Sequence, residues 1–292
     1  MDSHAPLISR GWPAPAKINL FLHVVGRRPD GYHLLQTLFQ FLDHGDDLTF
    51  TLREDGGIGR LNDLAGVPPE QDLVVRAARL LKAETGSPWG ADISVAKVLP
   101  LGGGLGGGSS NAATVLVALN ALWGTGLDAP ALAKLGLALG ADVPVFVHGV
   151  AAWAEGVGEL LTPFAPEEGP VLVVFPGCQV PTTAVFGHPQ LTRDTPAITI
   201  QRFSLAASHN DCEPITRRLY PAVGEALDRL SRHAPARMSG TGACVFACFA
   251  TREAAAAVGR ELPPAWQWFT AERRNRSPLL DRLDAERSAR GR

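Results

Sequence analysis

The chain has 292 residues, of which 46% are hydrophobic and 19% charged, and these values fit a globular protein of one large or two ordinary domains. Its 27 basic and 29 acidic residues leave a net charge of −2, so no excess of positive charge points to nucleic acid or to an anionic membrane. No apolar run reaches the roughly 20 residues of a membrane-spanning helix, and the four cysteines form no Cys-x-x-Cys pair. We expect a cytoplasmic protein with reduced thiols and with neither a nucleic-acid nor a membrane partner.

The first part of the chain predicts strands before any helix. Residues 16–25 (AKINLFLHVV) and 46–52 (DDLTFTL) have the patterns of strands. A helix is then expected from its N-cap Asp72 to Gly86, and it is followed by a strand at 91–100 (ADISVAKVLP).

The most unusual stretch comes directly after that strand. Residues 100–113 read PLGGGLGGGSSNAA, with six glycines in seven residues. Beyond it, apolar residues at helical spacing predict a helix that ends at Gly124, and a second helix is expected from the N-cap Asp128 to Gly140. The apolar run DVPVFV at 142–147 then predicts a short strand.

The composition of the sequence changes after Gly158, where a Pro-rich, acidic segment at 162–170 suggests a domain boundary. Strands and helices continue beyond it without strict βαβ alternation, which favours two α+β domains. The later segments are a strand at 171–177, a helix at 220–233, a glycine turn into a strand at 238–250, a strand at 265–272 and a tail at 286–292 that we expect to be disordered.

A strand, a glycine loop and a helix start together form an anion-binding arrangement. The unpaired N–H groups of a first helical turn and the positive end of the helix dipole point at the ligand. Ser109, Ser110 and Asn111 are placed to cap this helix and to donate to phosphate oxygens. A flexible linker is the plain alternative, but linkers do not usually lie between a patterned strand and a strong helix. We therefore interpret the loop as a phosphate site.

Two other nucleotide-binding loops fit less well. Gly102, Gly104 and Gly107 match G-x-G-x-x-G, but the acidic partner at Asp128 opens a helix instead of ending a strand. A Walker A loop fails because Ser109 stands where lysine is required. The loop must hold phosphate by its backbone, and the cation must come from elsewhere.

Two charged residues in apolar surroundings are candidates for the chemistry. Lys17 lies inside a strand pattern and Asp142 lies between a helix end and an apolar run. A lysine at a strand edge and a turn aspartate are the ordinary interpretations of each alone. Together they suggest a base and a cation around an incoming hydroxyl group.

Four segments in this order, PAPAKINLFL, PLGGGLGGGSSNAA, GADVPVF and MSGTGACVF, resemble the GHMP small-molecule kinases. RRPDGYHLLQTLFQFLDHGDDL, AEGVGE, VPTTAVF, NDCEP and SPLLDRL resemble more closely the members of that family that act on a cytidine diphosphate-linked methylerythritol. The resemblance extends from about Pro13 to Leu283.

The resemblance implies an α+β, two-domain GHMP kinase fold. The N-terminal ATP-binding domain, at 1–158, would carry a left-handed βαβ crossover, and the C-terminal domain, at 159–272, would be an α/β sandwich. Residues 273–292 would form a tail that returns to the N-terminal domain and ends in disorder. A monomer or a weak homodimer is expected.

The resemblance also implies ATP and Mg²⁺, with the γ-phosphate passed to the 2-hydroxyl of the erythritol. Asp142 would be the catalytic aspartate, which accepts or orients the hydroxyl proton, and Lys17 its partner lysine, which stabilises the developing alkoxide. The residues implied to bind ATP are Lys97, Pro100, Leu101, Gly102, Gly103, Gly104, Leu105, Gly106, Gly107, Gly108, Ser109, Ser110 and Asn111. Those implied to bind the other substrate are Asn19, Tyr32, His33, Thr182, Phe186, Gly240, Thr241 and Gly242.

The side chains of Tyr32, His33 and Phe186 have the chemistry that binding of a cytosine base requires. Tyr32 and Phe186 offer two ring faces between which a cytosine can stack, a contact worth roughly 1–3 kcal/mol per base. His33 can meet the base edge with a donor on one ring nitrogen and an acceptor on the other. Glycines 240 and 242 fit a phosphate-facing turn and a tight hairpin turn equally well. The Mg²⁺ ligands stay open, with Ser110 and Asp142 as candidates.

Three rival functions remain at this point. Another GHMP kinase, acting on homoserine, mevalonate or a sugar, would have no base to stack. A nucleotide-binding protein without catalysis would not need Lys17 and Asp142. A dinucleotide oxidoreductase would bind NAD.

Overall fold

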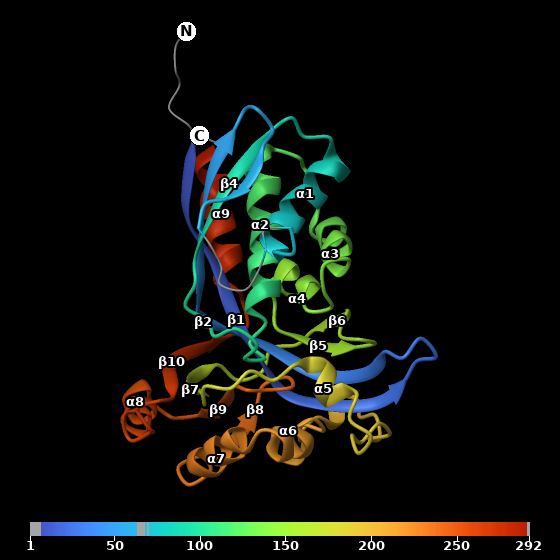
Figure 1. Cartoon of the computed structure of the whole chain (residues 1–292), viewed down its shortest axis with the longest axis vertical. Coiled ribbons are helices and arrows are strands. Elements are labelled where there is room, and N and C mark those ends of the chain that lie inside the picture. The colour runs from blue at the N-terminus through green and yellow to red at the C-terminus, as the bar shows by residue number, and fades with distance from the viewer. Residues whose placement is uncertain (1–6, 63–67, 69, 291–292) are drawn as a thin grey trace.

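A computed structural model describes residues 7–62, 68 and 70–290 of the chain (Figure 1). An elongated upper body holds α1 (Leu73–Thr85), α2 (Gly107–Trp123) and their neighbouring helices beside long strands. A lower body holds the later strands, with α7 (Pro221–Leu230) beneath them. The two bodies match the two-domain, mixed α+β class expected from the sequence.

Two long strands run through both bodies. β2 (His33–Arg53) pairs antiparallel with β1 (Ile8–Arg27) from the upper body to the hairpin at residues 27–33 in the lower body, and with β4 (Gly90–Ala96) in the upper body. It also pairs with β5 (Ala152–Glu155) and with β10 (Gln267–Arg274), which carries the sheet on into the lower body. The β1–β2 pairing shifts register between Pro15 and Lys17 and between Asn19 and Leu22. Such irregularities bend a strand and can re-aim side chains, and these two flank Lys17 and Asn19.

Among the described residues the sheet has ten strands, and seven of them follow the order β3-β4-β2-β10-β7-β9-β8. Within it, β3 and β4 are parallel and are joined through α1, which makes one βαβ unit. The other elements are β3 (Ile58–Arg60), α3 (Ala129–Leu137), α4 (Val143–His148), β6 (Leu160–Pro163), β7 (Gly169–Phe175), α5 (Thr182–Phe186), α6 (Glu213–Leu219), β8 (Ala236–Met238), β9 (Val245–Cys248), α8 (Arg252–Arg260), α9 (Pro278–Arg290) and two 3₁₀ turns at Ile200–Arg202 and Leu205–Ala207.

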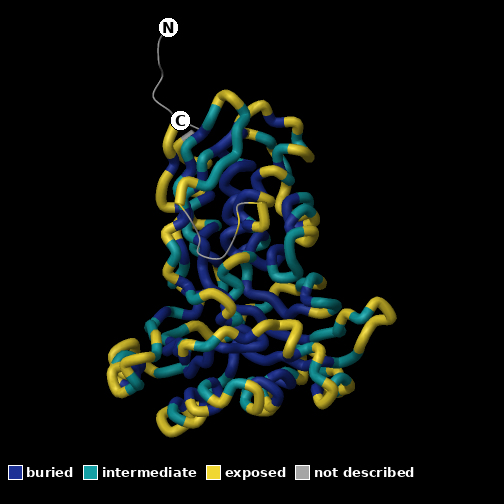
Figure 2. Tube along the Cα trace, in the orientation of Figure 1, coloured by how far each residue is buried: buried dark blue, intermediate teal, exposed yellow. Residues whose placement is uncertain are grey.

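Local signals set the helix ends that the sequence predicts. The Asp72 side chain accepts from the backbone N–H of Val74, and Gly86 closes α1 in the left-handed conformation. Gly124 closes α2 in the same way. Helix α2 is buried on every side from Ser110 to Asn120, as its place in the middle of the upper body in Figures 1 and 2 shows. Its apolar stripe is therefore only part of its buried surface.

Two expectations about the helices are wrong. The run at 142–147 is a helix, α4, because its apolar residues are all buried and a short, fully buried run has no period that separates helix from strand. Pro144, in the first turn of α4, is typical of a helix start. Helix α3 ends at Leu137, before Gly140, because the chain there tightens into turns toward α4.

The tail is also ordered further than expected. Helix α9 continues through Glu286 to Arg290, since Leu279 and Leu283 are buried in the core of the upper body. The Arg282 guanidinium lies 4.4 Å from the centre of the Trp12 ring. The last two residues of the predicted disordered end, 291–292, lie outside the described residues.

The predicted boundary at Gly158 lies in the turn between β5 and β6, which pair with each other, and β5 also pairs with β2. The lower body has its own core, in which Leu172, Leu227 and Val245 are buried. Among the described residues, no helix has the length and apolar character that crossing a membrane requires.

Candidate active site

The predicted residues meet around a cavity of about 440 Å³. Its walls come from β1 and β2, the glycine loop, the start of α4 and the turn between β8 and β9. The predicted residues that line it are Lys17, Asn19, Lys97, the unbroken run 100–109, Asp142, Thr182, Phe186, Gly240 and Thr241.

The glycine loop is shaped by close contacts with the lower body. Gly102, Gly104 and Gly106 have φ near +70°, a conformation that residues with a Cβ rarely adopt. A Cβ on Gly104 would lie 2.2 Å from the backbone oxygen of Ser239. The backbone N–H of Cys244 donates to the Gly103 carbonyl at 3.0 Å. Some of these glycines are therefore required by protein packing, in addition to any ligand.

Helix α2 begins earlier than expected, at Gly107, after Gly106 in the left-handed conformation. Ser109 and Ser110 are thus inside the first turn and do not cap it, because the glycines already provide the turn into the helix. The first intrahelical bond runs from the Ser110 N–H to the Gly106 carbonyl. The backbone N–H groups of residues 107–109 precede that bond and lie at the cavity, in an arrangement suited to an anion.

A carboxylate that the sequence analysis missed organises this loop. Asp46 is fully buried, and one of its oxygens accepts from the backbone N–H groups of Val98 and Leu99 at 2.8 and 2.9 Å. The other accepts from Lys97 Nζ at 2.5 Å and from Asn111 Nδ2 at 2.9 Å. Asn111 therefore turns into the protein and does not line the cavity.

No local signal pointed to Asp46. The sequence shows it only as one of two aspartates at the start of a strand pattern. Its partners come from segments about 50 and 65 positions further along the chain.

Lys17 and Asp142 are brought together as expected, with Lys17 Nζ 3.3 Å from Asp142 Oδ2. The lysine side chain is 4% exposed and also donates to Asn19 Oδ1 at 2.6 Å and to the Gly104 carbonyl at 3.2 Å. The ring of Phe39 lies 5.2 Å away. The aspartate side chain is 34% exposed and faces the cavity. The ammonium group of Lys17 is thus held by protein groups, whereas the carboxylate of Asp142 is accessible to a ligand.

The turn at 239–243 closes the cavity from the lower body and behaves as a tight turn. The Ser239 N–H donates to the Cys244 carbonyl, and the Gly242 N–H donates to the Ser239 carbonyl. Because its N–H is used within the turn, Gly242 is not available to a phosphate. Gly240 and Thr241 line the cavity, and Thr241 Oγ1 lies 3.4 Å from Thr182 Oγ1.

Tyr32 and His33 lie in an adjoining cavity of about 550 Å³, which shares Thr182, Phe186 and Val157 with the first. The His33 ring stacks on Phe186 with 5.1 Å between ring centres, and Tyr32 is 64% exposed. Burial lowers the pKa of His33 from its ordinary value, and the positive charges of Arg193 and Arg27 lower it further.

The fit of Mg²⁺ can be judged from the oxygen atoms present. Among the described residues, no cluster of three or more His, Cys, Asp or Glu side chains could hold a metal. Mg²⁺ in nucleotide sites needs only one or two carboxylates, with phosphate oxygens and water as its other ligands. Asp142 offers such a carboxylate, and the Ser110 hydroxyl is buried without a hydrogen-bond partner. The Asp142 carboxylate, which lines the cavity, and the Ser110 hydroxyl, which is buried directly beyond the lining residues 100–109, are candidate ligands for an ion that arrives with the nucleotide.

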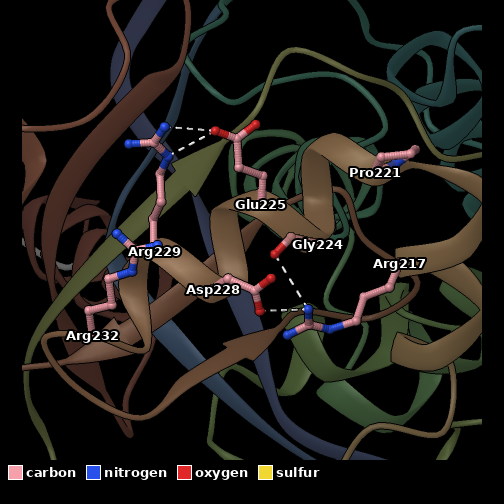
Figure 3. A pocket seen from close by; sticks show the side chains of 7 residues that line it. All are labelled: Arg217, Pro221, Gly224, Glu225, Asp228, Arg229 and Arg232. Carbon is pink, nitrogen blue, oxygen red and sulfur yellow. Dashed lines mark hydrogen bonds and ion pairs between the residues drawn. The ribbon is translucent and has the colours of Figure 1, made fainter.

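A further hollow lies on the outer surface of α6 and α7 and is lined by charged residues (Figure 3). There Arg217 pairs with Asp228 at 2.8 Å, and Arg229 pairs with Glu225 at 2.8 Å. Because the acidic residues neutralise these two cations, this hollow is a poorer phosphate site than the glycine loop.

The chain is similar to known kinases in sequence. Residues 72–150 match the family described as GHMP kinases N terminal domain, and residues 196–266 match GHMP kinases C terminal. A 4-diphosphocytidyl-2-C-methyl-D-erythritol kinase of Alkalilimnicola ehrlichii is 61% identical over 96% of this chain and 97% of its own length. The enzyme of the same name from Halorhodospira halophila is 59% identical over 92% and 94%.

Solved structures give the same result. A crystal structure of 4-(cytidine 5'-diphospho)-2C-methyl-D-erythritol kinase, 34% identical, superposes with a TM-score of 0.77 over 91% of this chain and 99% of its own. Homoserine kinase from Cytophaga hutchinsonii, 16% identical, has a TM-score of 0.62 over 94% and 97%. That second likeness shows the fold alone.

Proposed function

The chain belongs to the GHMP kinase family and, within it, to the 4-diphosphocytidyl-2-C-methyl-D-erythritol kinases, and on that premise we propose the reaction and the role of each residue. The protein transfers the γ-phosphate of ATP to the 2-hydroxyl of 4-diphosphocytidyl-2-C-methyl-D-erythritol, a step in non-mevalonate isoprenoid biosynthesis. The observation that carries the proposal is the Lys17–Asp142 pair, 3.3 Å apart, in a cavity walled by the glycine loop.

The glycine loop and the start of α2 bind the phosphates of ATP. The N–H groups of residues 107–109 donate to phosphate oxygens, and the helix dipole favours their negative charge. Asp46 keeps the loop in this shape by holding Lys97 and the backbone of 98–99. Lys97 contributes its positive charge at the rim of the cavity, although its ammonium group is already paired.

Asp142 and Lys17 act on the hydroxyl group of the second substrate. As the hydroxyl oxygen bonds to the γ-phosphorus, the bond to the ADP oxygen breaks and the hydroxyl proton moves to Asp142 or is oriented by it. The ammonium group of Lys17 stabilises the negative charge that develops on the attacking oxygen. Asn19 holds Lys17 in place through the 2.6 Å bond and is itself held by Thr37.

The cytidine end binds in the adjoining cavity. Tyr32 and Phe186 present ring faces to the base, His33 meets its edge, and Thr182, Gly240 and Thr241 lie between the base and the reacting hydroxyl. A plain alcohol such as homoserine has no group to fill this cavity, which disfavours the rival kinase functions.

Mg²⁺ is part of the proposal, with Asp142 and Ser110 as its protein ligands, and it would neutralise the charge of the transferred phosphoryl group. We also propose a cytoplasmic protein that is a monomer or a weak homodimer.

The test is direct. The pure protein is incubated with Mg·ATP and 4-diphosphocytidyl-2-C-methyl-D-erythritol while ADP release and the ³¹P spectrum are followed. A new phosphomonoester signal on the erythritol supports the proposal. ADP release with homoserine or another plain alcohol, and none with the cytidine substrate, would leave a kinase but refute the proposed substrate.

A further inference from the structure

His33 is held by two neighbours that define how its ring can bind a ligand. Its face stacks on Phe186, with 28° between the two ring planes. Its Nε2 atom accepts a hydrogen bond from Arg193 Nε at 3.0 Å. Stacking on Phe186 therefore fixes the orientation of the ring, and its Nε2 atom is already hydrogen-bonded to Arg193.

The bond to Arg193 determines where the imidazole carries its proton. A guanidinium group is always charged and can only donate, so the Nε2 atom that receives its hydrogen must offer a lone pair. A neutral imidazole with a lone pair on Nε2 carries its hydrogen on Nδ1. Protonation of Nε2 would break this bond and would place two cations together.

We propose that Arg193 is a positioning residue for base recognition, because it holds His33 as the neutral tautomer with the hydrogen on Nδ1. The site then offers the base a donor and no acceptor from this side chain. This inference rests on the proposed function and refines it, since the sequence alone left His33 free to be either a donor or an acceptor.

Arg193 is itself held firmly enough for this role. Its two terminal nitrogens donate to three backbone carbonyl groups, those of Leu191 at 3.0 Å, Phe186 at 3.0 Å and His188 at 2.8 Å. These bonds use the planar fork of the guanidinium group, and a lysine could not reproduce them. The same residue thus ties the segment that carries Phe186 to the ring that stacks on it.

A donor at this position gives a chemical reason to select cytosine. Cytosine presents acceptors at N3 and O2, whereas uracil carries a hydrogen on N3. An Nδ1–H group can pair with N3 of cytosine but opposes the N3–H of uracil, which leaves two donors facing each other. We expect the parent to prefer the cytidine substrate over its uridine analogue.

The surrounding charges keep His33 neutral in mildly acidic solution. Arg193 and Arg27 face it, and the one acidic residue that lines this cavity, Asp30, is paired with Arg28 at 2.7 Å. Burial and the two arginine charges lower the pKa of His33, so it stays unprotonated at pH values where an ordinary histidine begins to charge. Recognition of the base should accordingly change little between pH 7 and pH 6.

The decisive experiment is ¹⁵N NMR of the histidine rings in the full-length protein, with His33 assigned from its loss in His33→Asn. The parent should show His33 protonated on Nδ1 and unprotonated on Nε2. In Arg193→Met, the hydrogen should redistribute toward Nε2, and the pKa of the ring should rise from its value in the parent, because one of its two positive neighbours is gone while burial and Arg27 still lower it. Arg27→Met is the matched control, because it removes a nearby positive charge but no hydrogen bond to the ring. It should keep the Nδ1–H tautomer.

Kinetics separates this role from a merely structural one. In Arg193→Met, KM for the cytidine substrate should rise roughly tenfold, the effect of about one hydrogen bond, while kcat and KM for ATP stay within twofold. That KM should also rise further between pH 7 and pH 6, whereas we expect little change in the parent. The preference for cytidine over uridine should shrink.

A second pair of variants leaves Arg193 untouched. In His33→Asn the amide nitrogen can take the place of Nδ1, whereas in His33→Gln it reaches the place of Nε2. We expect His33→Asn to bind the cytidine substrate more tightly than His33→Gln.

Three results would overturn the inference: a parent ring protonated on Nε2, an Arg193→Met variant with unchanged tautomer and KM, or tighter binding by His33→Gln. No turnover of the cytidine substrate by the parent would refute the proposed function instead. The NMR result distinguishes the two failures, because it needs no substrate.

Discussion

Replacing Asp46 with asparagine should destabilise the protein by removing the centre of the hydrogen-bond network beneath the glycine loop. The carboxylate accepts four bonds, two on each oxygen, and its side chain is fully buried. Asparagine keeps one oxygen, which can still accept from the N–H groups of Val98 and Leu99. Its NH₂ group then faces Lys97 and the amide of Asn111.

The expected loss of stability follows from the side-chain groups that lose their hydrogen-bond partner when Asp46 is replaced. The Asn111 amide can turn its oxygen toward the new NH₂ group, so one bond is recovered. The ammonium group of Lys97 loses its partner, and a hydrogen bond to a charged group contributes about 1.5–3 kcal/mol. Because the Lys97 side chain is only 17% exposed, water replaces little of that bond, and leaving a buried charge unpaired adds to the loss. We expect a loss of about 3 kcal/mol in the free energy of unfolding, a large part of an ordinary stability of roughly 5–15 kcal/mol.

Urea denaturation followed by circular dichroism measures this loss, and KM for ATP measures its effect on the loop. KM should rise, since the N–H groups that we propose bind phosphate are positioned through residues 97–99. The double variant Asp46→Asn/Lys97→Met is the informative control. It removes the unpaired ammonium group of Lys97, and its free energy of unfolding should be about 1 kcal/mol higher than that of Asp46→Asn alone. If Asp46→Asn unfolds within about 0.5 kcal/mol of the parent, as an ordinary surface change does, and KM for ATP is unchanged, the reasoning is wrong.

Three further outcomes are expected. Gly104→Ala should abolish activity and lower Tm strongly, because its Cβ would lie 2.2 Å from a backbone oxygen, whereas Gly126→Ala, with a similar positive φ and open space, should cost only about 1–2 kcal/mol in thermal unfolding. Asp142→Asn should lower kcat by roughly 10²–10⁴ and should also lower Tm, because it removes the carboxylate that pairs with the buried Lys17; a variant nearly as active as the parent at saturating substrate would remove Asp142 from the mechanism. Burial raises the pKa of Cys212 to about 12, so this thiol should stay unmodified by a thiol reagent at pH 8 in the folded protein and react only on unfolding; rapid labelling under native conditions would contradict its burial.

The glycine loop and the helix that follows it were predictable because their signals are local. A strand, alternating left-handed glycines and a helix start are properties of neighbouring residues, and Asp72 and Gly86 set the ends of α1 through their own backbone contacts. The Lys17–Asp142 pairing was also expected, although the two residues lie far apart in the chain. That expectation came from the resemblance to a known family and from no contact visible in the sequence.

What the sequence could not indicate are hydrogen-bond partners that come from distant segments of the chain. Asp46 meets Lys97, and His33 meets Arg193 from 160 positions away. The helix α4 was mistaken for a strand for a related reason: burial on all sides removes the periodicity that would identify it. By itself the sequence determined which backbone conformations are possible at the loop and which residue types are present. The tertiary structure decided which donors meet which acceptors, because hydrogen bonds between distant segments depend on how strands, helices and loops pack against one another.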